Sequence, residues 1–231
     1  LPWLGRVVPA AHGVIPNDLA LIDRWKLLDN LRRSLLAPAL LVLFVAGWTL
    51  LPGAPLVWTL LGALTPGLPL LIAALRGLWQ LIWSTDRPGA WRRMQNALTD
   101  GAIRWLLFLA FLPYEALLFG DAIGATLVRL YIRRRKLLQW TTAARTVRIF
   151  GDEVSATTTM LHMLPAHLLT LAIGALLIST MPGRLWVAAP LLAMWLLAWQ
   201  IAYRISRPDP TEHAPLTASQ RTELRRLARH T

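Results

Sequence analysis

Residues 35–75 read LLAPALLVLFVAGWTLLPGAPLVWTLLGALTPGLPLLIAAL, a stretch without a single charged side chain. Two apolar runs, Leu35–Leu51 and Leu56–Leu75, flank the dipeptide Pro52-Gly53. A helix needs about 20 residues to cross the hydrocarbon core of a bilayer, and a Pro-Gly pair ends a helix and turns the chain. The stretch therefore predicts two membrane-spanning helices that are joined in a tight hairpin.

The second of these runs contains an interruption. Pro66, Gly67 and Pro69 lie inside it, and proline lacks the backbone N–H that a continuous helix uses. We expect a kink or a locally unwound stretch there, packed against protein rather than lipid.

A second hairpin is predicted further along the chain. Leu161–Met181 and Leu185–Tyr203 are apolar runs on either side of Pro182-Gly183, and this turn carries one charge, on Arg184. The sequence thus predicts an all-α integral membrane protein with two transmembrane helical hairpins, four spans in all, and interfacial amphipathic helices.

The composition agrees with this fold class. Of the 231 residues, 55% are hydrophobic and 16% are charged. The net charge of +12 has two explanations, a nucleic-acid partner or the excess of lysine and arginine that is typical of cytoplasmic loops. The basic residues cluster between the apolar runs, which favours the second explanation, so no nucleic-acid partner is expected. The lack of cysteine excludes disulfides, thiol nucleophiles and cysteine-bound metals.

The distribution of charge also predicts a topology. Lysine and arginine number five up to Ser34, twelve from Arg76 to Arg148 and six after Tyr203, against one in the two turns. Cytoplasmic loops carry the positive excess, so all three basic sections and both termini should be cytoplasmic. That arrangement requires an even number of spans, and four fits.

The basic middle section contains one further apolar run. Trp105–Tyr114 has ten residues, which suits an interfacial or re-entrant helix better than a span. After Pro113, charged and apolar residues separate onto two helical faces, which predicts a second amphipathic helix at the membrane surface. It leads into a cluster that we expect to bind anionic lipid headgroups, namely Arg133, Arg134, Arg135 and Lys136.

These boundaries divide the chain into five segments. They are a cytoplasmic juxtamembrane segment with an amphipathic helix (1–34), the first hairpin (35–75), the basic cytoplasmic or interfacial section (76–158), the second hairpin (159–205) and a linker that enters a helix of the next domain (206–231). The chain lacks an initiator Met, and a capping pattern at Thr217 opens a helix that is still running at Thr231. We therefore expect a larger parent protein.

The sequence contains no P-loop, no HExxH zinc motif and no usable Ser/His/Asp spacing. The pair Asp152-Glu153 suits a metal ion or, more simply, a solvated loop. His162 and His167 point about 140° apart on a helix, which favours two interfacial residues over one metal site. Glu115 lies among apolar residues. It could pair with Arg104 or a neighbouring domain, or hold a substrate hydroxyl.

The densest group of polar residues precedes the first span. Its guanidinium groups suit a pyrophosphate, and its tryptophan can stack on a sugar ring. Its members are Arg24, Trp25, Lys26, Asp29, Asn30, Arg32 and Arg33. Two interpretations stay open: a surface close to substrate and nucleotide, or positive charge before a span with internal Asp–Arg pairs.

At these residues the chain resembles the bacterial cyclic β-1,2-glucan synthases. The similarity recurs along the chain from Leu1 to Thr231, and the basic and aromatic motifs are specific in combination, whereas the apolar spans are generic. The motifs are Asp23–Leu35 (DRWKLLDNLRRSL) with the following span through Gly47-Trp48, Ala110–Leu118, Arg133–Ala143 and Leu224–Arg229.

The resemblance implies a multi-pass segment of the bacterial inner membrane. In that family a cytoplasmic glycosyltransferase domain lies upstream and transfers glucose from UDP-glucose to a β-1,2-linked chain with a divalent metal (Mg or Mn). Glycoside-processing domains lie downstream. The chain itself is then expected to hold no catalytic residue, metal site or cofactor.

The partners that the resemblance implies are the lipid bilayer and these two kinds of domain. The β-glucan chain is a further partner if the spans guide it rather than serve only as an anchor. A stand-alone membrane scaffold or transporter subunit without catalysis is the alternative from a different functional class.

Overall fold

The computed structural model describes residues 5, 7–10, 13–133 and 155–207. Strands β1 (Val7–Ala10) and β2 (Gly13–Pro16) form an antiparallel ladder in which Val7 pairs with Pro16. The prediction of an all-α chain did not include this ladder, which is rich in the β-branched residues that favour strands. The elements that follow are helical, as predicted.

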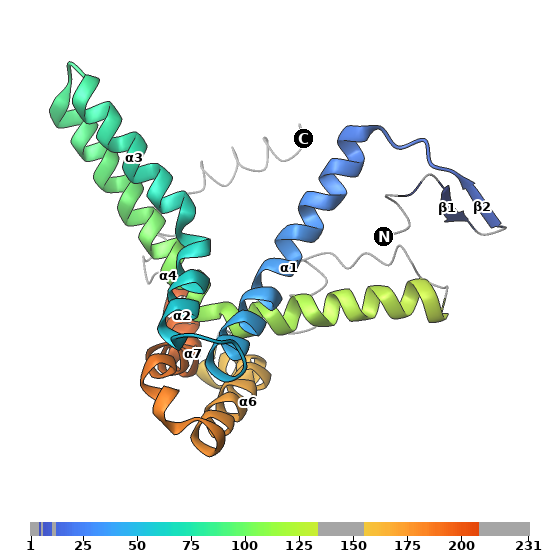
Figure 1. Cartoon of the computed structure of the whole chain (residues 1–231). Coiled ribbons are helices and arrows are strands. Elements are labelled where there is room, and N and C mark those ends of the chain that lie inside the picture. Colours follow the sequence, from blue (N-terminus) through green and yellow to red (C-terminus); the bar gives the residue numbers. More distant parts are fainter. Residues whose placement is uncertain (1–4, 6, 11–12, 134–154, 208–231) are drawn as a thin grey trace, which may run out of the picture.

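Helix α1 (Leu21–Thr49) joins two elements that the sequence predicted in succession. The amphipathic segment before Ser34 and the apolar run after it form one continuous helix, as expected (Figure 1). The apolar part of α1 contributes buried residues to the core, among them Phe44 and Trp48.

The chain then turns at Pro52-Gly53 into α2 (Pro55–Leu64), as predicted. A 3₁₀ turn, η2 (Thr65–Gly67), separates α2 from α3 (Leu68–Trp83). The interruption expected at Pro66 and Gly67 is therefore present. Helix α3 extends beyond Leu75, where the second apolar run was predicted to end.

Glycines allow α1 and α2 to approach closely. A Cβ atom on Gly47 of α1 would lie 2.5 Å from the Cβ of Trp58, and a Cβ on Gly62 of α2 would lie 2.6 Å from Cε1 of Phe44. Each helix thus places an aromatic ring against a glycine of the other. The indole of Trp48 also donates a hydrogen bond to the hydroxyl of Thr59, at 2.8 Å.

Helix α4 (Arg87–Leu127) corrects the prediction for the middle section. The short helix expected at Trp105–Tyr114 and the amphipathic helix expected after Pro113 are parts of this one helix, which has 41 residues and continues as a π-helical turn, η3 (Val128–Arg133). Pro113 lies inside the helix and does not end it.

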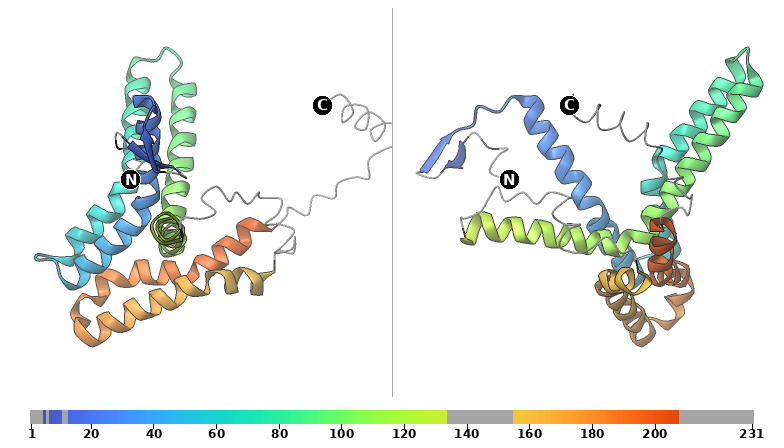
Figure 2. Two further views of the ribbon diagram at one scale, coloured as in Figure 1. Left: turned by 90° about the vertical axis from the view of Figure 1, so that its right-hand side faces the viewer. Right: turned by 180° about the vertical axis from the view of Figure 1, so that it is seen from behind.

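The course of α4 defines the shape of the molecule. Its first part pairs with α3 in a two-helix arm that projects from the other helices, and its second part bends away in a different direction (Figure 1). In the left view of Figure 2, the second part of α4 is seen end-on, whereas α6 and α7 run across the view.

Helices α6 (Ala156–Thr180) and α7 (Leu185–Ser206) lie where the sequence predicted the last two spans. The predicted turn between them is a 3₁₀ turn, η4 (Pro182–Arg184). The two helices pack against each other, and α4 contacts both of them as well as α1 and α3.

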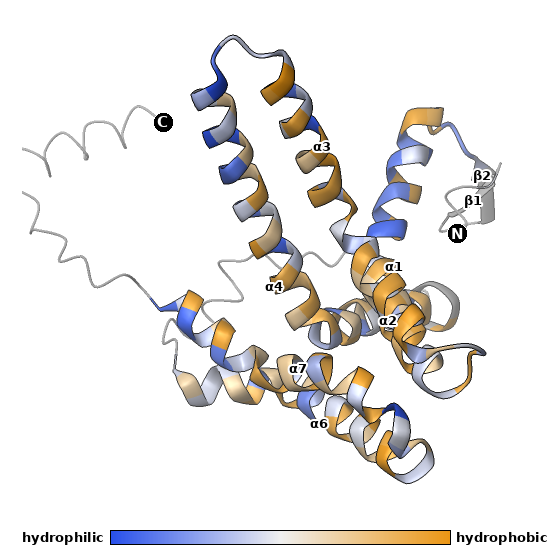
Figure 3. Ribbon diagram, turned by 60° about the vertical axis from the view of Figure 1, so that its left-hand side comes forward, coloured by the Kyte–Doolittle hydropathy of each residue, from blue (hydrophilic) through white to orange (hydrophobic). Residues whose placement is uncertain are grey.

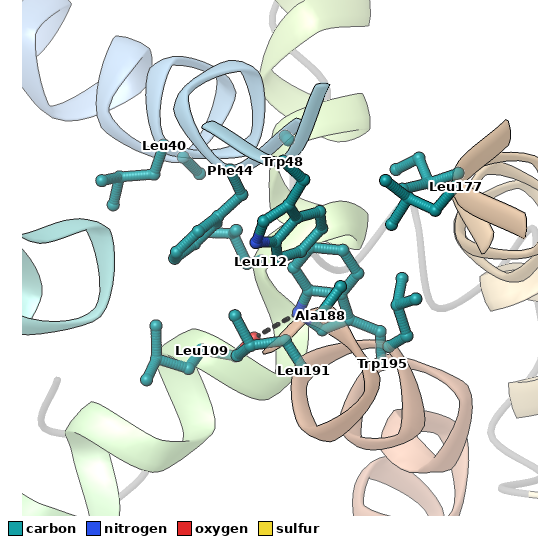
Figure 4. Packing of buried hydrophobic residues seen from close by; sticks show 13 residues of the cluster. Leu40, Phe44, Trp48, Leu109, Leu112, Leu177, Ala188, Leu191 and Trp195 are labelled. Carbon is teal, nitrogen blue, oxygen red and sulfur yellow. Dashed lines mark hydrogen bonds between the residues drawn. The ribbon is translucent and has the colours of Figure 1, made fainter. Parts of the chain in front are cut away.

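The core lies where α1, α4, α6 and α7 meet (Figure 4). Three aromatic rings form its centre: Phe44 stacks on Trp48 with ring centroids 5.6 Å apart, and Trp195 of α7 lies 6.2 Å from Phe44 and 5.9 Å from Trp48. Leu109 and Leu112 of α4 pack against this group.

A hydrogen bond between α7 and α4 stabilises α4 where it continues past Pro113. Proline cannot donate to the carbonyl oxygen four residues before it, which here belongs to Leu109. The buried indole Nε1 of Trp195 donates to that oxygen instead, at 2.9 Å. Figure 4 shows this bond, which satisfies a buried carbonyl group that would otherwise lack a partner.

A backbone carbonyl group at the break between α2 and α3 also accepts a hydrogen bond from another helix. The last carbonyl groups of a helix have no donor within that helix, and Ala63 is one of those at the end of α2. The indole Nε1 of Trp105, in α4, donates to the carbonyl oxygen of Ala63 at 2.7 Å.

The described part of the chain has five helical stretches that are long and apolar enough to cross a membrane. They are α1, α2 with α3, α4, α6 and α7. The molecule is therefore a membrane protein, and α4 adds one candidate to the four spans that the sequence predicted.

The pairing of Trp195 with Pro113 predicts non-additive mutations. Trp195→Phe keeps most of the packing but leaves the carbonyl of Leu109 without a donor, so it should cost about 1–3 kcal/mol of unfolding free energy. Pro113→Ala restores a backbone donor to that carbonyl, and Trp195→Phe should then cost clearly less. Unfolding of purified protein in mixed micelles, followed for both single variants and the double variant, gives the coupling energy. Additive effects would contradict this role.

Candidate functional site

The basic group predicted as a site lies on the first turns of α1, before the apolar part of the helix. Hydrophilic residues predominate along this segment, with hydrophobic positions among them (Figure 3). Trp25 exposes 65% of its surface, and Asn30 is also exposed. The group thus lies at the polar N-terminal end of α1, whereas the turn at Pro52-Gly53 follows the C-terminal end of this helix.

Two of the cations have acceptors close by in the chain. The guanidinium of Arg24 donates to the carbonyl oxygens of Leu19 and Asn17, at 3.1 and 2.9 Å. Asn17 in turn donates to the carbonyl of Gly5, at 2.7 Å. Lys26 pairs with Asp23 at 3.0 Å. Arg24 therefore holds the segment between the β-ladder and α1.

The other two cations share one carboxylate. Asp29 accepts from Arg32 at 2.8 Å and from Arg33 at 2.7 Å. The hydrogen bond from Arg32, with the charges of Arg33 and Arg32, holds the pKa of the Asp29 carboxyl below its usual value. The internal Asp–Arg pairs that one interpretation expected are present, and a phosphate ligand would have to compete with Asp29 for both guanidinium groups.

Arg32 also lines a groove that the sequence did not indicate. The groove, of about 840 Å³, lies between α1, the η2–α3 junction and α4. Arg104 and Asp100 of α4 line it with Arg32, and the rest of the lining is largely apolar. Residues about 70 positions apart meet here because α3 and α4 fold back on α1, and no local pattern could have predicted that.

A second concave site lies between α4, α6 and α7. This pocket has a volume of about 530 Å³. Its lining is mostly apolar and aromatic, with polar groups from α4 and α6: Phe111, Tyr114, Glu115, Leu118, Phe119, Thr159, His162, Met163 and Ala202. We call it the Glu115 pocket.

Glu115 is half-buried in this pocket. The predicted ion pair with Arg104 is not formed, since Arg104 lines the groove beside α1, and the salt bridges among the described residues do not include Glu115. The two residues are eleven positions apart on α4, which is about three helical turns and roughly 16 Å along the axis, too far for a direct ion pair.

The two histidines have separate surroundings, as predicted. His162 lines the Glu115 pocket. The ring nitrogens of His167 lie 2.7 Å from the carbonyl oxygen of Met163 and 3.2 Å from that of Leu196, which ties α6 to α7. Within the described ranges, no three histidine or acidic side chains lie close enough together to hold a metal ion.

Several predicted features lie outside the described residues. These are Arg134, Arg135 and Lys136 of the lipid-headgroup cluster, the pair Asp152-Glu153 and the helix expected from Thr217. For Arg133, only the backbone at the end of η3 is described.

Comparison with known proteins gives one informative match. The chain is 26% identical over 222 residues to the cyclic beta-(1,2)-glucan synthase NdvB of Rhizobium meliloti (strain 1021). The match covers 93% of this chain but 8% of the length of that protein. No family model matches the chain. The similarity agrees with the resemblance found in the sequence motifs and relates the chain to one segment of a much longer protein.

Proposed function

We propose that the chain is the membrane portion of a UDP-glucose-dependent glucosyltransferase, which anchors the catalytic domain at the cytoplasmic surface of the bacterial inner membrane. The observation that carries this proposal is the similarity to a glucan synthase along 93% of the chain. The apolar helices support the anchoring role. On this proposal the divalent metal and UDP-glucose bind to the catalytic domain, not to this segment.

A contact between the two turns supports four crossings. Arg184 donates to the carbonyl oxygens of Trp48 and Thr49 at the end of α1, at 3.2 and 3.5 Å. A cation at a helix C-terminus is favourable because the last carbonyl groups lack donors. Both turns therefore lie at the same end of the molecule.

This contact limits which helices can cross. Three candidate spans lie between the two turns: α2 together with α3, then α4, then α6. If each of these three crossed once, the two turns would lie on opposite sides of the membrane. We therefore propose that α1, α2 with the start of α3, α6 and α7 cross, and that α4 does not. Its second part, seen end-on where α6 and α7 run across the view, would then lie along the membrane surface (Figure 2).

The arm formed by α3 and the first part of α4 suits the same surface. Helix α3 exposes an apolar stripe, whereas the first part of α4 is hydrophilic (Figure 3). The stripe consists of Leu71, Ile72, Leu75, Leu78, Trp79, Ile82 and Trp83. An amphipathic element of this kind lies in the interface with its apolar face toward lipid, and tryptophan is enriched at that level.

The topology can be tested by labelling introduced cysteines with a maleimide. The chain itself has no cysteine, so it adds no background labelling. Gly53→Cys and Gly183→Cys in the turns should both react with an impermeant maleimide in intact spheroplasts. Asn96→Cys, on the arm, should react only after permeabilisation. Labelling of Gly53→Cys and Gly183→Cys from opposite sides would contradict four crossings.

The catalytic role predicts glucosyl transfer by the complete protein. Membranes with the product of the whole reading frame should incorporate labelled glucose from UDP-glucose into a β-1,2-linked glucan. Membranes from cells without the gene are the control. Correctly inserted protein that transfers no glucose would contradict the proposal and favour the scaffold or transporter alternative.

The basic end of α1 is proposed to couple the catalytic domain to the membrane, close to UDP and the growing glucan. Arg24→Gln with Lys26→Gln should lower the rate per inserted molecule. A charge-assisted contact that acts in the transition state is worth about 10- to 150-fold. Arg92→Gln, an exposed arginine on the arm, is the matched control. Equal rates per inserted molecule for the parent, the double variant and the control would contradict this role. The group would then serve only as positive charge that orients the first span.

A further inference from the structure

The Glu115 pocket lies at the end of the helices that is remote from both turns. Thr159 and His162 belong to the first turns of α6, and Ala202 belongs to the last turn of α7. The turn between α6 and α7 is at Pro182–Arg184. On the proposed topology the pocket therefore opens on the cytoplasmic side, where the catalytic domain would be.

The lining residues limit the class of ligand. None of the described residues that line the pocket is a lysine or arginine, and one is a carboxylate. A nucleotide or an anionic lipid headgroup would meet negative charge there without a balancing cation. The groove beside α1 differs from the pocket in that cations, Arg32 and Arg104, line it.

Glu115 supplies an acceptor that the described part of the chain does not use. Among these residues, no hydrogen-bond donor or cation lies within bonding distance of its half-buried carboxylate. A carboxylate in a largely apolar pocket gains most from a donor that arrives with a ligand. Tyr114 of α4 and Thr159 of α6 add polar groups to the lining, and the Thr159 hydroxyl itself donates to the carbonyl oxygen of Ser155 at 3.0 Å.

The α4 wall that carries Glu115 is also aromatic. Phe111, Tyr114 and Phe119 come from successive turns of α4 and face the pocket. A volume of about 530 Å³ with an apolar lining and a few polar groups is typical of small-molecule sites. A glucosyl residue matches this lining, because its C–H faces pack on rings and its hydroxyl groups donate to a carboxylate.

We propose that the Glu115 pocket binds glucosyl residues of a β-linked glucan, with the carboxylate of Glu115 accepting from sugar hydroxyl groups and the α4 rings packing on the sugar faces. This rests on the proposed function and adds a site to it. The glucan would be held at the cytoplasmic end of α6 and α7, beside the catalytic domain, without passing through the membrane.

Binding of a short linear β-1,2-linked glucooligosaccharide to the complete purified protein in detergent, measured by titration calorimetry, tests the site. Glu115→Gln should weaken binding about tenfold or more, since a charge-assisted hydrogen bond is lost. Phe119→Ala should weaken it as well. Asp121→Asn removes an acid on the same helix outside the pocket lining and should bind like the parent.

Thermal unfolding of each variant separates loss of the site from loss of the fold. If Glu115→Gln fails to fold, Thr159→Val provides a second variant, from the α6 side of the pocket. Unchanged affinity in folded Glu115→Gln, or binding of a choline-headgroup lipid in place of the oligosaccharide, would overturn the site. Either result leaves glucosyl transfer from UDP-glucose intact, and only the failure of that assay would remove the proposed function.

Discussion

The hydrogen bond from the indole of Trp195 to the carbonyl oxygen of Leu109 joins α7 to α4 inside the core, where α1, α4, α6 and α7 meet. Inside a membrane protein no water is available for a carbonyl group that loses its helical donor. Pro113 creates such a group, and α7 satisfies it. Helix α4 can therefore bend at the core and continue. The bend separates the first part of α4, which packs on α3 in the arm, from the part of α4 that carries Glu115 over α6 and α7.

The same requirement is met at two helix ends. Trp105 donates to the end of α2, and Arg184 donates to the end of α1. In each case the donor comes from a different helix, so the repair of a break also fixes how two helices pack.

Local sequence signals were sufficient to predict most helices and turns, but not how the helices pack against one another. The turns at Pro52-Gly53 and Pro182-Gly183, the break at Pro66 and the continuity of α1 follow from proline, glycine and hydropathy, and all were predicted. Helix α4 was divided in two because Pro113 is a helix-breaking signal, and its compensation by Trp195 depends on a residue 82 positions away. The shared groove of Arg32 and Arg104 likewise depends on the fold and has no sequence pattern.

The structure also changes which charges matter for function. The sequence draws attention to the basic group on α1, but its four cations already have carbonyl or carboxylate acceptors within the chain. A group that is compensated in this way is well suited to hold a fixed geometry between the membrane and a neighbouring domain. Glu115, one acid in a basic protein, has no such compensation among the described residues and lies in a concave site. The net charge of +12 thus bears on orientation in the membrane, whereas the proposed ligand contact rests on a carboxylate that has no partner among the described residues.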